Sequence, residues 1–201
     1  GSYFSRNLSI DGALSYGRNG YDSHRLITVG QLQERASSDH DGDLFSAYLK
    51  TGSHHDFHSW FLGPFASLEY ISLDEESFTE EGAGSLNLKV DGRRSSALVS
   101  ELGLCLERVI EVKHGTLVPE LTVSWLHDFD IDDRMITSSF AGSPGTAFSI
   151  RGNNAEKNGA TLGAGATFIH QNGISTSLQY KGWRRESCTS QGVMGEIRYA
   201  F

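Results

Sequence analysis

The last ten residues of the chain alternate strictly between two kinds of side chain. One set holds only apolar and small residues, namely Val193, Gly195, Ile197, Tyr199 and Phe201. The other set contains both charged residues of the segment, Glu196 and Arg198. Because successive side chains of a strand point to opposite faces, this period of two predicts a strand with one apolar and one hydrated face.

The same alternation recurs in segments of about ten residues, separated by Gly, Asn, Asp or Ser. The segment 97–112 is the most informative, because Leu98, Leu102, Leu104 and Leu106 share one parity while Glu101 and Glu107 share the other. Carboxylates on one strand face do not pack into a dry core without partners, so a hydrated lumen suits them better. In total the pattern predicts eleven strands, at roughly 8–16, 21–33, 43–51, 60–71, 85–90, 97–112, 116–125, 135–150, 160–169, 174–181 and 192–201.

The turns between these strands are predicted from their residue types. Asn19-Gly20 tolerates the positive φ angles of a tight hairpin, so 18–20 is predicted to be a turn, and 37–42 a polar loop. When strands are counted backward from a C-terminus taken as periplasmic, the short loop 113–115 falls on the outer side, against the trend, but five other turns, most of them short, fall on the periplasmic side. These predicted turns are 18–20, 52–56, 91–94, 130–133 and 172–173.

Composition narrows the class of protein. The 201 residues suit one domain, 1–201, of which Gly1-Ser2 resembles a cloning scar, and we expect the chain to be part of a longer exported protein. No apolar run approaches the roughly 18 residues of a membrane helix, which excludes a helical membrane protein. The net charge of −8 disfavours nucleic acid as a partner. Cys105 is predicted in a strand and Cys188 in a loop, as two free thiols.

Several segments resemble one known family in the same order along the chain. Trp125-Leu126-His127-Asp128-Phe129 resembles the W-x-H-x-F motif of the autotransporter β-domain, with Trp125, His127 and Phe129 at its defined positions. Residues 78–83 resemble the family's F-x-E-x-G-A segment through Phe78, Glu80 and Gly82. Tyr16-Gly17 with Asp22 and Arg25 is similar to its early hairpin, and Ile197, Tyr199 and Phe201 to its C-terminal signature.

The resemblance implies a transmembrane antiparallel up-and-down β-barrel of twelve strands in the bacterial outer membrane. Such a barrel is the translocator of type V secretion: it exports and anchors an N-terminal passenger and is not an enzyme. The implied partners are outer-membrane lipid, the passenger and the barrel-assembly machinery, which recognises the last strand through Phe201, Tyr199 and Ile197. With about eleven strands predicted, we expect the first strand and the linker helix to lie outside this sequence.

The alternation also predicts which side chains meet which environment. The predicted lumen-lining residues are Glu69, Glu101, Glu107, Glu196 and Arg198. The predicted lipid-facing residues are Leu98, Leu102, Leu104, Leu106, Leu121, Val123, Leu178, Tyr180 and Ile197. Interfacial aromatic girdles are predicted from Trp60, Tyr70, Trp125, Trp183, Tyr199 and Phe201. Some members of the family release the passenger by cyclisation of a linker Asn, which has no counterpart here, so a plain lumen lining is predicted.

Two clusters of potential metal ligands do not match an ion site. In the acidic stretch 39–43 the Gly stands fourth, whereas a calcium-binding EF-hand loop needs it sixth. His54, His55 and His58 fit no standard zinc spacing and are predicted to form a solvated turn. We therefore predict no metal site, no cofactor and no catalytic residues.

Two alternatives to the translocator remain open. A stand-alone outer-membrane porin or adhesin would share the barrel and differ in what precedes it. A soluble β-sandwich binding module would show the same alternation, with its apolar faces turned inward.

Overall fold

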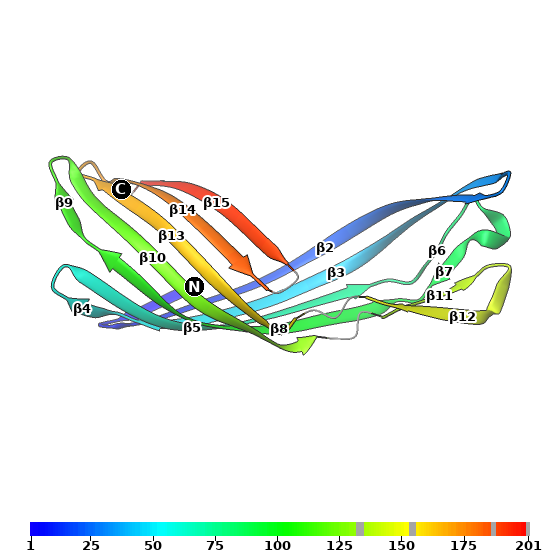
Figure 1. Ribbon diagram of the computed structural model, residues 1–201, viewed down its shortest axis with the longest axis horizontal. Helices are drawn as coiled ribbons and strands as arrows, with labels where there is room; N and C mark the ends of the chain where they lie inside the picture. Colours follow the sequence, from blue (N-terminus) through cyan, green and yellow to red (C-terminus); the bar gives the residue numbers. More distant parts are fainter. Residues whose placement is uncertain (132–134, 153–155, 186–187, 200–201) are drawn as a thin grey trace.

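The computed structural model describes residues 1–131, 135–152, 156–185 and 188–199. Most of these residues form one antiparallel sheet that curls along its length (Figure 1). In sheet order its strands are β1 (Ser2–Ser5), β2 (Leu8–Val29), β3 (Leu32–Ser53), β5 (Trp60–Glu75), β8 (Arg93–Arg108), β10 (Gly115–Ile131), β13 (Asn158–His170), β14 (Ile174–Arg184) and β15 (Thr189–Tyr199). The strands of this sheet are antiparallel neighbours in the order in which they occur in the chain, which confirms the predicted all-β, up-and-down fold.

A smaller sheet lies at one end of the molecule. Its order is β12 (Ser143–Arg151), β11 (Met135–Phe140), β7 (Leu88–Val90) and β6 (Phe78–Thr79). Between β6 and β7 lies the 3-10 helix η1 (Gly84–Leu86), and no helix in the described residues is long or apolar enough to cross a membrane. Two short strands extend the main sheet: β4 (His55–Phe57) pairs with β5, and β9 (Ile110–Val112) pairs with β10.

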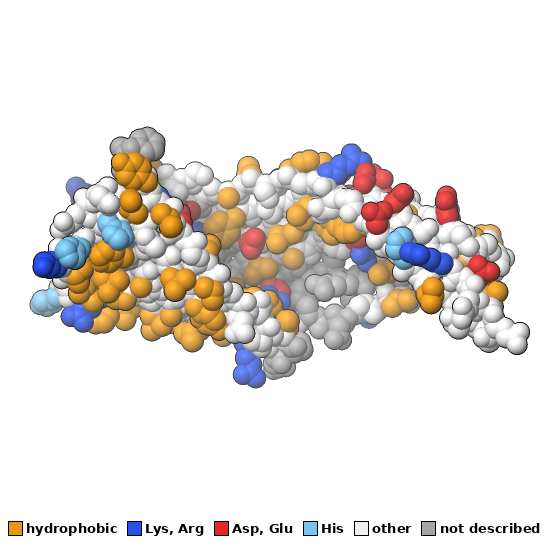
Figure 2. All heavy atoms as spheres, turned by 90° about the horizontal axis from the view of Figure 1, so that it is seen from above, with side chains coloured by type: hydrophobic (Ala, Val, Ile, Leu, Met, Phe, Trp, Pro, Cys, Tyr) orange, Lys and Arg blue, Asp and Glu red, His pale blue; other side chains and the backbone are white. Residues whose placement is uncertain are grey.

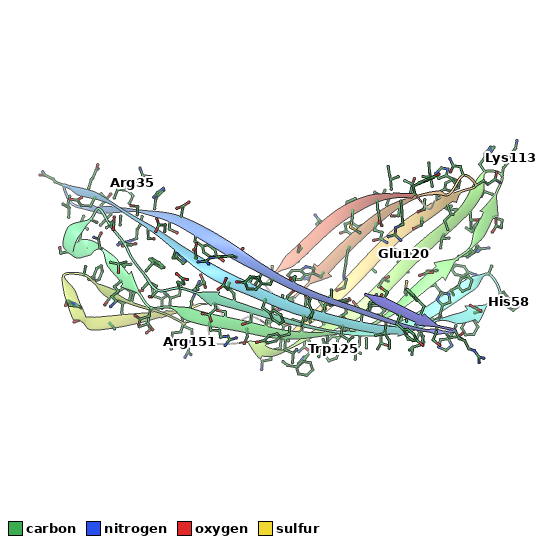
Figure 3. All side chains as sticks on the ribbon, turned by 180° about the vertical axis from the view of Figure 1, so that it is seen from behind. Arg35, His58, Lys113, Glu120, Trp125 and Arg151 are labelled. Carbon is green, nitrogen blue, oxygen red and sulfur yellow. The ribbon has the colours of Figure 1, made fainter. Side chains whose placement is uncertain are left out.

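The main sheet has two unlike ends. At the end that we call the turn end, the turns Arg6-Asn7, His58-Ser59, Lys113-His114 and Gln171-Gly173 join neighbouring strands. Two of them touch, because Gln171 Nε2 donates to the carbonyl oxygen of Lys113 at 3.5 Å. The opposite end, the hairpin end, holds the β2–β3 turn at Gly30-Gln31 and the smaller sheet. Figure 3 labels His58 and Lys113 at the turn end, and Arg35 and Arg151 at the hairpin end.

The predicted hairpin at residues 18–20 was wrong. Strands β2 and β3 form one ladder of 22 residues each, in which Asn19 is opposite Gly42 in mid-strand, and the predicted loop 37–42 belongs to β3. The turn lies instead at Gly30, whose φ of 62° is one that glycine adopts without steric cost. Residues 18–20 resemble a turn in the sequence, but they belong to a part of the strand in which neither face has to be apolar.

This error also misplaced several turns. The pair Asp91-Gly92 lies beside the smaller sheet, and Asp128 to Ile131 continue β10 instead of turning, whereas 132–134 lie outside the described residues. Residues 85–90 and 135–150, each predicted as one strand of the main sheet, form parts of the smaller sheet. The main sheet has eleven strands in the described residues, the predicted number, but not the predicted set.

The two faces of the curled sheet differ in polarity. Leu102, Leu104, Val123 and Trp125 lie opposite one another in register on the convex face, and each is about half exposed. The only large or small hydrophobic side chains that are buried in the described part of the chain are those of Ala36 and Ala83. Figure 2 shows hydrophobic side chains gathered over the half with the turn end, and charged side chains prominent over the half with the long hairpin. The fold is therefore one curled sheet with its large apolar side chains outside, unlike a sandwich of two stacked sheets.

Candidate functional site

The concave face of the sheet holds a polar cavity of about 580 Å³. It lies within the curl and is lined by residues of β1 to β3, β5, β8, β10, β13 and β14. Its charged and polar lining residues include Tyr48, Lys50, Glu101, Cys105, Glu107, Glu120, Thr122, Gln179 and Lys181. These polar side chains come from alternate residues of their strands, because the neighbouring side chains point to the convex face.

Glu101 is the most constrained carboxylate of this cavity. Its side chain is 14% exposed, and Ser124 Oγ of the neighbouring strand donates to its Oε1 at 2.5 Å. Lys181 Nζ of β14 lies 3.7 Å from the same oxygen. These contacts join three strands across the concave face and compensate the charge of Glu101.

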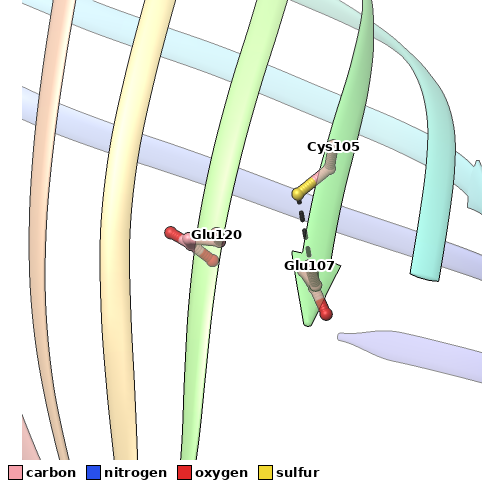
Figure 4. A group of neighbouring side chains, drawn as sticks. All are labelled: Cys105, Glu107 and Glu120. Atoms are coloured by element: carbon pink, nitrogen blue, oxygen red, sulfur yellow. Dashed lines mark hydrogen bonds between the residues drawn. The ribbon is translucent and has the colours of Figure 1, made fainter. Parts of the chain in front are cut away.

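A second group of the cavity contains Cys105, Glu107 and Glu120, shown in Figure 4. One ligand-type atom from each residue lies within 4.8 Å of the other two. Cys105 Sγ donates to Glu107 Oε1 at 3.6 Å, and Thr122 Oγ1 donates to the sulfur at 3.5 Å. The three side chains come from β8 and β10, which lie next to each other.

The structure does not bring all the predicted lumen residues together. Glu101 and Glu107 line the cavity, and Glu69 lies on the same face of β5, opposite Tyr48. Glu196 and Arg198 lie on β15, separated from β8 by three strands, where Arg198 Nη2 donates to Glu196 Oε1 at 2.8 Å. They therefore form their own exposed pair.

Sequence reasoning missed four charged residues of the cavity: Arg6, Lys50, Glu120 and Lys181. The signal for Glu120 was present, since it has the opposite parity to Leu121 and Val123. The predicted aromatic girdle also contained one error: Trp183 shares its face with Gln179 and Lys181, and lies opposite Thr161 of the cavity.

The motif residues Phe78, Glu80 and Gly82 hold the segment after β5 against the long hairpin. Arg25 of β2 donates to both carboxylate oxygens of Glu80, with Nε to Oε1 at 3.0 Å and Nη2 to Oε2 at 2.5 Å. The backbone N–H of Leu88 also donates to Glu80 Oε2, at 2.8 Å, and Arg25 Nη2 donates to the carbonyl of Leu86. We call this arrangement of Arg25, Phe78, Glu80 and Gly82 the hairpin clamp.

The other two motif residues complete the hairpin clamp. Phe78 stacks on His40 with ring centroids 4.3 Å apart, and His40 stacks in turn on Tyr21 at 5.0 Å. Gly82 has a φ of 102°, and a Cβ there would lie 2.5 Å from the carbonyl oxygen of Arg35. Only glycine satisfies both conditions, so the spacing Phe78, Glu80, Gly82 is explained by three contacts with β2 and β3.

The contacts of the hairpin clamp also favour the charged forms of Glu80 and Arg25. Burial opposes ionisation of Glu80, but the hydrogen bonds from Arg25 and from the Leu88 N–H outweigh it and hold the pKa of the carboxyl below its usual value. The same carboxylate raises the pKa of Arg25. Both groups are consequently charged at neutral pH, as a bidentate Arg–carboxylate pair requires.

The W-x-H-x-F residues form a ladder on the convex face of β10. The rings of Trp125 and His127 are 5.5 Å apart, and those of His127 and Phe129 are 4.7 Å apart, edge to face. His127 Nδ1 also bonds to Asn158 Oδ1 of β13 at 2.9 Å. This motif therefore stabilises the outer surface of the sheet and does not contribute side chains to the cavity.

The C-terminal signature lies on β15. Ile197 is 78% exposed and Tyr199 is 60% exposed, both on the apolar face. Phe201, the third predicted residue, lies outside the described residues.

The remaining candidates have ordinary partners. Cys105 in β8 and Cys188 between β14 and β15 are both free thiols, as predicted. The turn histidines have separate partners, because His54 packs on Phe61 and His55 bonds to Ser53.

Sequence comparison finds similar proteins that are much longer than this chain. The chain is 22% identical over 206 positions to BigA of Salmonella typhimurium, named as a candidate surface-exposed virulence protein, covering 98% of this chain and 10% of BigA. It is 25% identical over 148 positions to the esterase EstA of Pseudomonas aeruginosa, covering 71% of this chain and 22% of EstA. The chain thus spans about a tenth to a fifth of the length of these relatives.

The family comparison covers nearly the whole chain. The family model described as 'Autotransporter beta-domain' matches residues 1–181 of this chain. The up-and-down sheet, the polar concave face and the motif contacts belong to the same stretch. The chain therefore belongs to the autotransporter β-domain family.

Proposed function

We propose that this domain spans the bacterial outer membrane and serves as the translocator and surface anchor of an N-terminal passenger. The observation that carries this proposal is the opposite polarity of the two faces, since charged residues line the concave cavity while the convex face is apolar. A hydrated lumen accepts Glu101, Glu107, Glu120, Lys50 and Lys181, whereas lipid accepts the convex leucines. The site is one of passage and not of catalysis.

The dimensions of the convex face support a membrane-spanning role. On β5, Trp60 and Tyr70 lie on this face ten residues apart, and the positions between them are Leu62, Pro64, Ala66 and Leu68. At ~3.3 Å per residue and a tilt of about 40°, ten residues rise about 25 Å, the height of the apolar band of an outer-membrane barrel. The two aromatic residues would then lie at the two interfaces.

The two ends of the sheet support one orientation of the domain in the outer membrane. All four connections at the turn end have two or three residues, and outer-membrane barrels have short turns on the periplasmic side. The hairpin end, with β2, β3 and the smaller sheet, would therefore face the outside of the cell.

We further propose that Ile197, Tyr199 and Phe201 are recognised by the barrel-assembly machinery. Deletion of Phe201 should slow assembly, measured as a delay in the appearance of the heat-resistant folded form.

The experiment that tests export uses the natural full-length protein with an epitope placed upstream of the domain. Outer membranes are isolated, and protease is added to intact cells. We expect the protein in the outer membrane, faster migration in unboiled than in boiled gels, and a protease-accessible epitope. A folded membrane form with a protected epitope would favour a porin, and a detergent-free soluble protein would contradict membrane insertion altogether.

A further inference from the structure

The cavity contains an arrangement of charge that passenger export does not require. Glu107 and Glu120 are directly opposite each other on β8 and β10, and both side chains enter the cavity with the thiol of Cys105. Like charges directly opposite in a sheet are destabilising. In the described part of the chain neither carboxylate has an ion pair within 4.0 Å, although the side chain of Gln179 forms a hydrogen bond with Glu120 and the charge of Lys50 partly offsets that of Glu120. Lys50, the cation of β3 that lines the same cavity, lies with its Nζ 4.5 Å from the ring centroid of Phe65.

The surroundings of the three side chains leave room for their convergence. A Cβ on Gly165 would lie 2.8 Å from Glu120 Oε1, so the carboxylate occupies space that another residue would fill. The hydroxyl of Thr122 donates to Cys105 Sγ, a bond that also stabilises a thiolate. These features are independent of the charge pair, and both favour the ligand atoms at their present positions.

We propose that Cys105, Glu107 and Glu120 form a binding site for a divalent transition-metal ion of borderline softness, with Zn²⁺ as its best representative. Mg²⁺ and Ca²⁺ prefer ligand sets made entirely of oxygen, whereas Zn²⁺ accepts thiolate and carboxylate together. Three protein ligands leave a fourth position for water, which the open cavity supplies. On binding, the S–H bond of Cys105 breaks, a sulfur–metal bond forms, and the proton leaves to solvent.

Bound metal would cross-link β8 and β10 inside the lumen. The ion would neutralise the opposed carboxylates and narrow the cavity at this level. The site uses only residues of two adjacent strands, so it does not depend on the presence of a passenger.

The test uses protection of Cys105 from alkylation. The sequence has two cysteines, so Cys188→Ser leaves Cys105 as the reporter thiol. With this variant extracted in detergent from outer membranes, Zn²⁺ should slow maleimide labelling at least tenfold, and a chelator should restore the rate. Because loss of an indirect supporting residue already costs roughly 10- to 100-fold in metal affinity, Glu107→Gln and Glu120→Gln should each abolish protection at the same zinc concentration.

Glu101→Gln is the matched control, since it removes a carboxylate of the same cavity outside the group, and it should keep the protection. Unboiled gel migration verifies that each variant is folded. Protection should strengthen as the pH rises, because the thiol must lose its proton. Labelling that Zn²⁺ leaves unchanged would overturn the proposal, and so would protection that survives both carboxylate substitutions, since that would be adventitious binding to the thiol.

A second measurement remains available if a carboxylate variant does not fold. Cd²⁺ added to the folded Cys188→Ser protein should produce a thiolate-to-metal charge-transfer band in the ultraviolet, absent from the Cys105→Ser, Cys188→Ser protein. No such band in the folded parent would also overturn the proposal.

Discussion

The two halves of the main sheet are stabilised in different ways. In the half with the turn end, side chains are sorted by face, and apolar residues such as Leu104 and Val123 are exposed on the convex side. In the half with the hairpin end, order comes from specific pairs. Arg25 pairs with Glu80, Arg93 with Glu75, and Arg185 with Asp128, each with both carboxylate oxygens engaged.

This difference follows from the surroundings that we propose for each half. Lipid stabilises any exposed apolar side chain of suitable size, so a simple period of two is enough to define the first half. Water does not stabilise exposed apolar side chains on one face in this way, and a long two-stranded hairpin is only marginally stable by itself. The second half therefore needs individual contacts, of which the hairpin clamp is the most elaborate.

The largest expected effect comes from placing a charge on the convex face. Leu104→Arg should lower the stability of the folded protein in lipid by roughly 2–4 kcal/mol, the cost of Arg near the centre of a bilayer. The measurement is denaturant unfolding in lipid vesicles, with the amount in outer membranes as a second readout. Gln179→Arg on the concave face is the control and should insert normally. Equal behaviour of the two variants would contradict the assignment of the faces.

The next largest effect tests the hairpin clamp through its glycine. Gly82→Ala places a Cβ against the carbonyl oxygen of Arg35 and forces a φ of 102° on alanine, which should cost about 2 kcal/mol. Limited proteolysis should then cut the region 76–92 faster, while the membrane-embedded part stays folded. The control is Gly17→Ala, where the added Cβ meets nothing within 4 Å. Unchanged proteolysis of the Gly82 variant would show that the segment is held by other contacts.

A smaller effect is expected from the carboxylate of the hairpin clamp. Glu80→Gln should destabilise the segment by about 1–2 kcal/mol at pH 7, at the low end for a charged hydrogen bond because the Arg25 side chain is 36% exposed. The measurement is hydrogen exchange of the Leu88 amide, which donates to Glu80. The exposed neighbour Glu81 gives the control, Glu81→Gln, which should leave this exchange rate unchanged.

The same pair predicts a dependence on pH. The pKa of Glu80 is lowered in the folded protein, so its contribution is fully present above the unfolded value of about 4.3 and is lost as the pH falls through the lower folded value. After correction for intrinsic exchange, protection of Leu88 in the wild type should therefore fall on acidification toward that of Glu80→Gln. A constant gap between the two proteins down to pH 2 would contradict this role.

The comparison also explains which features the sequence could predict. Alternation identified the all-β class and the convex and concave sets on β8 and β10, because both depend on parity alone. It failed at Asn19-Gly20, whose turn-like composition lies within the long hairpin, since a paired strand in water carries polar residues on both faces. Parity also places Glu120 on the concave face, but the opposition of Glu120 to Glu107 depends on the register of two strands, which a single segment does not contain.

The smallest effect concerns the aromatic ladder of β10, where the two kinds of stabilisation meet. His127 contacts Trp125 and Phe129 on the apolar face, and also bonds to Asn158 of β13. His127→Ala should cost about 0.5–1.5 kcal/mol from the lost ring contacts, with a separate part from the lost bond. A double-mutant cycle with Asn158→Ala, followed by denaturant unfolding in vesicles, separates the two. A coupling energy near zero would mean that the ladder stabilises this strand through ring packing alone, as in the rest of the lipid-facing half. A clear coupling energy would mean that the convex face is also stabilised by a specific pair of side chains, as the hairpin end is.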